Sequence, residues 1–180
     1  MKRRKSGRVA LCGMMCALAM TLMLAGSIFP FATFCGPAIG GILLMPVAME
    51  CGMQLAWMCY GALSLLTILF LPDKESALIF VFLFGHYPLL KGYIQRLPGR
   101  WLQAVVKTAA FNLLVLACYG VLLYLFPVEY IVREFASQAP LAVGGMLLLG
   151  NVCFWVYDAA LTNLARVYVA RFRPLLLRFL

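Results

Sequence analysis

Four charged residues interrupt otherwise apolar segments of this sequence: Glu50, Lys91, Lys107 and Asp158. When the segments are aligned as membrane spans, all four fall within about two helical turns of the same membrane face. A charge costs roughly 2.5–3.5 kcal/mol at the bilayer centre on insertion scales and less near its edge. Two acids and two bases are therefore tolerable there if they pair. We expect an inner charge layer that either clamps helix ends together or gates and couples transport.

A second group of polar side chains lies nearer the middle of the predicted spans. It comprises His86, Asn112 and Asn151, with Tyr87, Tyr119 and Trp155 as flanking aromatic side chains. One interpretation is a substrate pocket, in which the polar groups orient a small molecule and the rings stack on it. The other interpretation is hydrogen bonding between helices, which contributes on the order of 0.6–2 kcal/mol per contact. The residues alone leave both open.

Motifs for catalysis and metal binding are missing from the sequence. Its single histidine excludes an HExxH or multi-histidine metal site, and it has no GxSxG, P-loop or CxxC motif. The seven cysteines mostly lie in apolar segments, where a thiol behaves as a small hydrophobic group. We therefore expect neither an enzyme nor a resident cofactor or metal.

The amino-acid composition indicates a protein embedded in a lipid bilayer. Of its 180 residues, 65% are hydrophobic and 12% are charged, about half the usual charged share of roughly 25% in soluble domains. Too few charged side chains exist to cover a water-facing surface. The net charge of +9 does not indicate nucleic acid, because the basic residues cluster at helix ends, as anchoring to an anionic leaflet requires.

The pattern predicts an all-α polytopic membrane protein, a single domain of residues 1–180 with six transmembrane helices. The expected spans are residues 9–29, 37–50, 53–71, 76–96, 101–126 and 141–165, with a basic leader at 1–8 and a basic tail at 166–180. The second span is short and contains Gly40, Gly41 and Pro46. It is therefore the least certain of the six to cross the bilayer.

The distribution of basic residues predicts the orientation. Twelve lie in predicted inner segments: Lys2, Arg3, Arg4, Lys5, Arg8, Lys91, Arg96, Arg100, Arg166, Arg171, Arg173 and Arg178. The predicted outer loops contain only Lys74 and Arg133. Because basic residues favour the cytoplasmic side, we expect both termini in the cytoplasm and a multi-pass protein of the cell membrane.

The first span contains small residues at every fourth position, Gly13, Ala17, Thr21 and Ala25. Small side chains at this spacing let another helix approach closely. The row predicts either packing within this bundle or docking onto a second membrane protein.

The number of spans, the basic N-terminus, the small-residue row and an apolar first outer loop resemble the S component of energy-coupling factor (ECF) transporters. The resemblance covers nearly the whole chain through loose motifs, and GMMCALAMTLMLAGSIFPF and LPDKESALIFVFLFGHYPLLK carry most of it. It implies a membrane-embedded subunit that binds a vitamin or micronutrient from the outer side. It also implies docking, through Gly13, Ala17 and Thr21, onto a coupling membrane subunit driven by two ATPase subunits. No residue pattern identifies the substrate.

Two other functions fit the same features. A non-transporting membrane scaffold, similar to the MreD cell-shape protein, needs no pocket at mid-depth. A small proton-coupled secondary carrier needs a titrating group in such a pocket, for which His86 or Asp158 is the candidate.

Overall fold

The computed structural model of the chain describes residues 2–28, 33–125 and 140–173, and every regular element in these ranges is a helix. The helices are α1 (Lys2–Gly26), α2 (Cys35–Cys51), α3 (Met53–Phe70), α4 (Lys74–Ile79), α5 (Tyr87–Ile94), α6 (Arg100–Leu125) and α8 (Pro140–Val167), with π-helical turns η2 (Phe80–Phe84) and η3 (Tyr168–Phe172). The predicted all-α fold is confirmed. Among the described residues, five continuous helical segments are long and apolar enough to cross a membrane, namely α1, α3, α6, α8 and the joined segment Lys74–Ile94, whereas α2 has 17 residues.

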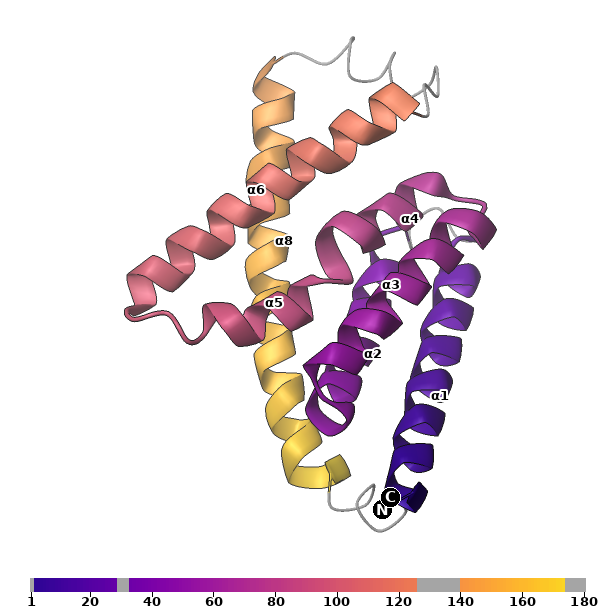
Figure 1. Ribbon diagram of the computed structural model, residues 1–180. Helices are drawn as coiled ribbons and strands as arrows, with labels where there is room; N and C mark the ends of the chain where they lie inside the picture. Colours follow the sequence, from indigo (N-terminus) through magenta and orange to yellow (C-terminus); the bar gives the residue numbers. More distant parts are fainter. Residues whose placement is uncertain (1, 29–32, 126–139, 174–180) are drawn as a thin grey trace.

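The helices form two groups joined by the α4–η2–α5 segment. Helices α1, α2 and α3 lie side by side, while α6 crosses α8 on the other side of the molecule (Figure 1). Of the joining segment, Lys74–Ile94, 61% is buried, against 17–22% of the other four long helices. This segment is therefore the centre around which the remaining helices pack.

A local break in hydrogen bonding divides this central segment. The Gly85 amide donates to the Phe80 carbonyl, five residues back, instead of to the Val81 carbonyl as in an α-helix. Pro88 has no N–H and so cannot donate to the Phe84 carbonyl. Gly85 and Pro88 both lie at this break, and the π-helical turn η2 is the form that the irregularity takes.

Helix α2 packs closely on both sides because it carries glycines. A Cβ atom on Gly40 would lie 3.0 Å from the Met23 sulfur of α1, and one on Gly41 would overlap the Phe84 carbonyl oxygen of η2. Dispersion contacts and close backbone approach replace the hydrophobic effect between helices in lipid. Gly41 thus lets α2 contact η2 at the position where Pro88 leaves a carbonyl without its helical donor.

Side chains of the turn between α3 and α4 satisfy backbone groups at the ends of both helices. Asp73 Oδ1 accepts a hydrogen bond from the Glu75 amide at 3.1 Å, which caps α4. Lys74 Nζ donates to the Ile68 and Leu71 carbonyls at 2.9 and 3.0 Å, which satisfies the last turn of α3.

The last helix is longer than the sequence predicted. Residues 166–172, assigned to a tail, continue α8 as a helix through η3; residues 174–180 lie outside the described range. Asp158 is therefore fourteen residues before Phe172, about 21 Å along the helix, instead of two turns from its end. The arginines at the end of this helix do not stop it, because arginine is a good helix former.

Candidate functional site

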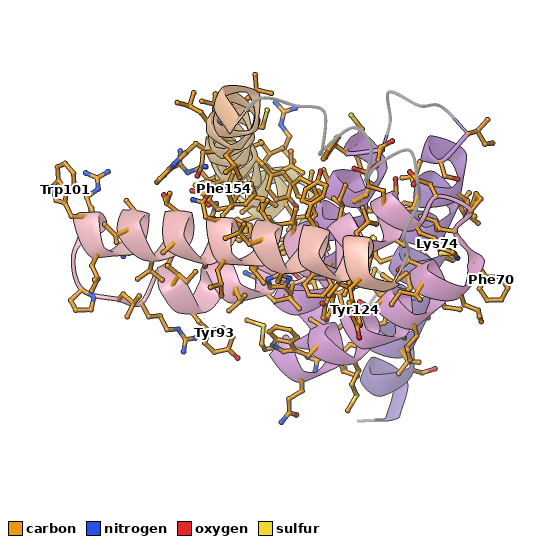
Figure 2. All side chains as sticks on the ribbon, turned by 90° about the horizontal axis from the view of Figure 1, so that it is seen from above. Phe70, Lys74, Tyr93, Trp101, Tyr124 and Phe154 are labelled. Atoms are coloured by element: carbon orange, nitrogen blue, oxygen red, sulfur yellow. The ribbon has the colours of Figure 1, made fainter. Side chains whose placement is uncertain are left out.

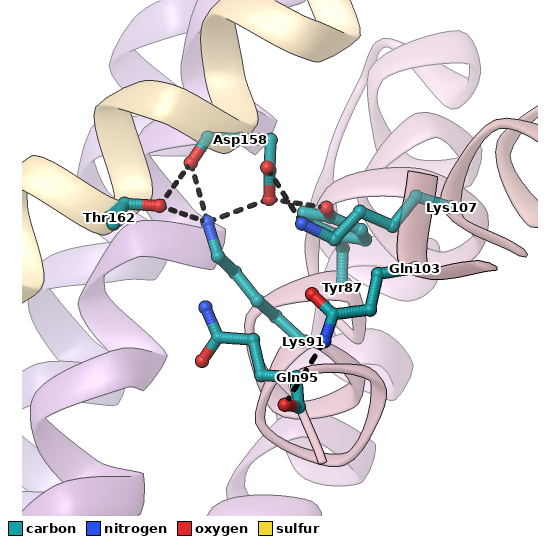
Figure 3. A network of polar contacts seen from close by, with 7 residues as sticks. All are labelled: Tyr87, Lys91, Gln95, Gln103, Lys107, Asp158 and Thr162. Atoms are coloured by element: carbon teal, nitrogen blue, oxygen red, sulfur yellow. Dashed lines mark hydrogen bonds and ion pairs between the residues drawn. The ribbon is translucent and has the colours of Figure 1, made fainter. Parts of the chain in front are cut away.

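The carboxylate of Asp158 on α8 is shared by three side chains from two other helices (Figure 3). Tyr87 on α5 donates its hydroxyl hydrogen to Asp158 Oδ1 at 2.6 Å, and Lys91 Nζ lies 2.7 Å from the same oxygen. Lys107 Nζ on α6 lies 2.9 Å from Asp158 Oδ2. We call these four residues the Asp158 cluster. Tyr87 and Lys91 reach one carboxylate because side chains four residues apart share a helix face.

The two lysines of the cluster are held differently. Lys91 Nζ also donates to the Asp158 main-chain carbonyl and, at 2.7 Å, to Thr162 Oγ1. These bonds and the Asp158 carboxylate together use all three hydrogens of its ammonium group. Lys107 Nζ has only Asp158 Oδ2 as a partner among the described residues, so two of its hydrogens remain available.

The cluster is buried and positively charged. Lys91 is 5% exposed, Lys107 8% and Asp158 7%. In their ordinary charge states, two ammonium groups and one carboxylate leave one positive charge uncompensated. Removing charges from water is expensive unless geometry and hydrogen bonding are favourable, and here only the Lys91–Asp158 half fulfils both conditions.

The predicted inner charge layer is only partly brought together. Lys91, Lys107 and Asp158 meet, but Glu50 does not join them: its Oε1 lies 3.1 Å from Arg173 Nε. Glu50 has this different partner because α2 ends beside the end of η3. The same end of the molecule holds the start of α1, where the Cys51 thiol donates to the Arg8 carbonyl at 3.4 Å.

The predicted middle layer separates into an amide pair and a distant histidine contact. Asn112 Nδ2 donates to Asn151 Oδ1 at 3.1 Å, and Asn151 Nδ2 donates to Asn112 Oδ1 at 3.0 Å. Each amide nitrogen also donates to the carbonyl four residues before it, Thr108 and Leu147 respectively. The two amides therefore satisfy each other, as the helix-bonding interpretation predicts.

His86 contacts the π-helical turn instead of the asparagines. Its Nδ1 lies 3.2 Å from the Val81 carbonyl, and its ring lies 6.1 Å from that of Tyr60. A carbonyl only accepts, so the hydrogen is on Nδ1. Tyr60 donates its hydroxyl hydrogen to the same carbonyl at 2.7 Å. Both side chains thus satisfy a carbonyl that the break in the helix leaves free, and the described hydrogen bond of His86 is to this carbonyl and not to either asparagine.

The aromatic residues predicted to flank a pocket also lie apart. Tyr119 donates its hydroxyl hydrogen to Glu75 Oε1 at 3.4 Å, and Trp155 is 41% exposed. The rings that do pack beside the Asp158 cluster include two that the sequence did not single out, Phe111 and Phe154. They stack with centroids 4.5 Å apart, and Phe154 meets Tyr87 edge-on at 4.9 Å.

The small-residue row of α1 lies on the outside of the molecule. Gly13, Ala17 and Thr21 are exposed, and a Cβ atom on Gly13 would have no neighbour within 4 Å among the described residues. Thr21 Oγ1 donates to the Ala17 carbonyl at 2.9 Å, so the hydroxyl is satisfied within the helix. The opposite face, with Ala19 and Met23 buried, packs against the bundle.

Residue types and contacts define a class of protein but no family. The apolar helices make the chain a multi-pass α-helical membrane protein. No protein-family model, curated protein or solved structure matches it. Within the described residues, no group of three or more His, Cys, Asp or Glu side chains could hold a metal ion.

Replacing Asp158 by asparagine tests whether the cluster stabilises the fold. Asp158→Asn leaves two buried ammonium groups without a counter-charge, and we expect a loss of about 3–5 kcal/mol of folding free energy, measured by unfolding in detergent. The triple variant Lys91→Met, Lys107→Met, Asp158→Leu removes all charges of the cluster and should recover most of the lost folding free energy. An Asp158→Asn protein as stable as wild type would contradict the ion pairing.

Asn151→Leu tests the amide pair. It leaves the Asn112 amide without its partner, so we expect stability to fall by about 1–3 kcal/mol while any bound small molecule is retained. Adding Asn112→Leu should restore part of the loss, because both partners are then removed. Loss of ligand with an unchanged melting temperature would instead place the pair in a substrate site; mass spectrometry of gently purified protein measures the retention.

Proposed function

We propose that the chain is the substrate-binding membrane component of an ECF-type micronutrient or vitamin uptake transporter. In this function it binds a small molecule from the outer side and docks on a coupling membrane subunit that two ATPases drive. The sequence resemblance suggests it, and the observation that carries it is the free face of α1.

That face has the properties that a helix-docking surface needs. Gly13, Ala17 and Thr21 are exposed, so a second helix can approach the backbone closely along the row. Met14 and Leu18, beside the row, are 65% and 47% exposed and would contribute apolar packing. Had the row been needed for internal packing, it would face α2, which instead contacts the buried side of α1.

The six-span topology and the orientation belong to this proposal. Contacts between Arg8 and Cys51 and between Glu50 and Arg173 hold the start of α1 and the end of η3 at one end of the molecule. Two termini at one end fit an even number of crossings, with α2 as the sixth span. The excess of basic residues in the predicted inner segments supports a cytoplasmic location for that end and the cell membrane as the site of the protein.

The two other functions retain specific support. The side-chain amides of Asn112 and Asn151 hydrogen-bond to each other and so join two helices, as a scaffold requires. Asp158 is a buried carboxylate between two lysines and a tyrosine, which fits a proton-coupled carrier. A scaffold predicts no bound small molecule, and a carrier predicts transport by the isolated chain without ATPases.

Cysteine labelling tests the topology. In a Cys35→Ser background, which removes the exposed native thiol near the start of α2, Pro72→Cys should react with a membrane-impermeant maleimide applied outside intact cells, and Pro98→Cys should not. Both prolines are exposed in turns. Pro98 is preferred to Gly99, whose φ of +94° disfavours a side chain. The inverse labelling pattern would reverse the orientation.

Ala17→Trp tests the docking face. The indole would block close helix approach, so we expect the coupling subunit and ATPases to be lost from the purified complex, while the variant melts within a few degrees of wild type. Leu69→Trp is the matched control, because Leu69 is 72% exposed on α3 and its replacement leaves the row intact. Retention of the complex by Ala17→Trp, or absence of ATPases from the wild-type preparation, would contradict the proposal.

A further inference from the structure

The Asp158 cluster carries one positive charge that no other described residue compensates. Apart from Asp158, the described acids are engaged elsewhere: Glu50 with Arg173, Asp73 with the start of α4, and Glu75 with Tyr119. Lys107 is nevertheless only 8% exposed. Its ammonium group contacts the Asp158 carboxylate, whose single negative charge compensates only one of the two lysines.

We propose that Lys107 binds a monovalent oxyanion, such as a carboxylate or a phosphodiester, between α5 and α6. Such a group brings the charge of the cluster to zero, whereas a dianion would overcompensate it. It also presents more than one acceptor oxygen, which matches the two hydrogens that Lys107 Nζ has available. Lys91 cannot fulfil this role, because Asp158 and Thr162 already use its three hydrogens.

The surroundings of Lys107 favour entry of an anion from the turn between α5 and α6. Gln103 lies one helical turn before Lys107 on α6, and Gln95 directly follows the last residue of α5, so both residues lie toward that turn (Figure 3). Gln103 Nε2 donates to the Leu97 carbonyl at 2.9 Å. The charged residues of the turn, Arg96 and Arg100, are basic and exposed. A positive potential that increases toward a buried ammonium group concentrates anions at its entrance.

Two sources share this chemistry, the headgroup of an anionic lipid and a soluble anion. Helix α6 offers lipid access along its exposed side, where Trp101 is 87% and Val105 61% exposed, and Figure 2 shows Trp101 projecting from the bundle. A soluble anion would enter through the polar side chains of the turn. The ligand class is the same in both cases, and the inference does not depend on the transporter proposal.

The experiment measures the melting temperature of the full-length protein in phosphatidylcholine nanodiscs. One arm adds phosphatidylglycerol to the discs; the other adds acetate or dimethyl phosphate, with sodium chloride at equal ionic strength as the reference. We expect at least one arm to raise the melting temperature of wild type by several degrees. A rise with phosphatidylglycerol alone identifies a lipid, and a rise with a soluble probe identifies a soluble ligand.

Variants connect the effect to Lys107. In Lys107→Met the Lys91–Asp158 pair is neutral, so this variant should fold without the anion and lose the shift; Lys107→Arg should keep it. Arg100→Gln removes an exposed charge of the same turn and should retain most of the shift. The proposal is overturned if wild type shows no shift in either arm, if Lys107→Met keeps it, or if Arg100→Gln alone abolishes it. The two measurements on wild type still test the proposal if Lys107→Met does not fold, because a protein that shows no shift in either arm contradicts it.

Discussion

A single carboxylate determines how the second half of this protein is assembled. Apolar side chains give helices little reason to associate in lipid, because the lipid tails are equally apolar. Asp158 joins α8 to Tyr87 and Lys91 of α5 and to Lys107 of α6. The Asn112–Asn151 pair joins α6 to α8 a second time. Lys107 pairs with Asp158, and Asn112, five residues later on α6, pairs with Asn151, seven residues earlier on α8. The two contacts together therefore fix an antiparallel register.

The break in the central segment makes these contacts possible. An uninterrupted α-helix over residues 74–94 would use the Val81 carbonyl for a hydrogen bond within the helix. The π-helical turn and Pro88 instead leave the Val81 carbonyl to Tyr60 and His86 and place the Phe84 carbonyl against Gly41. Irregular backbone at membrane depth persists only where protein satisfies it. The polar side chains around η2 therefore stabilise the irregular segment that carries Tyr87 and Lys91 to Asp158.

The sequence predicted which residues are polar within the spans, but it did not predict how they pair. Hydropathy locates helices, so the central segment, predicted at residues 76–96, was found close to the observed Lys74–Ile94. Pairing depends on the rotation of each helix, which a span apolar on every side does not encode. Glu50 was placed in the inner charge layer by its depth, and in the structure the end of η3 brings Arg173 to it. The one pairing signal in the sequence is a four-residue spacing, between Tyr87 and Lys91 and between Asp158 and Thr162, which places each pair on a shared helix face.

The two faces that matter for the proposals, the α1 row and the Asp158 cluster, lie on different groups of helices, yet a continuous series of close contacts joins them. Met23 of α1 packs on Gly36 and Gly40 of α2, and one residue later Gly41 lies against Phe84 and near the Tyr157 hydroxyl. The Tyr157 hydroxyl donates a hydrogen bond to the Ala38 carbonyl at 3.4 Å. Tyr157 directly precedes Asp158 in the sequence. The glycines of α2 thus bring its backbone close to Met23 of α1 on one side and to Phe84 of η2 and Tyr157 of α8 on the other. Helix α2 thereby connects the helix that carries the small-residue row with the helix that carries Asp158.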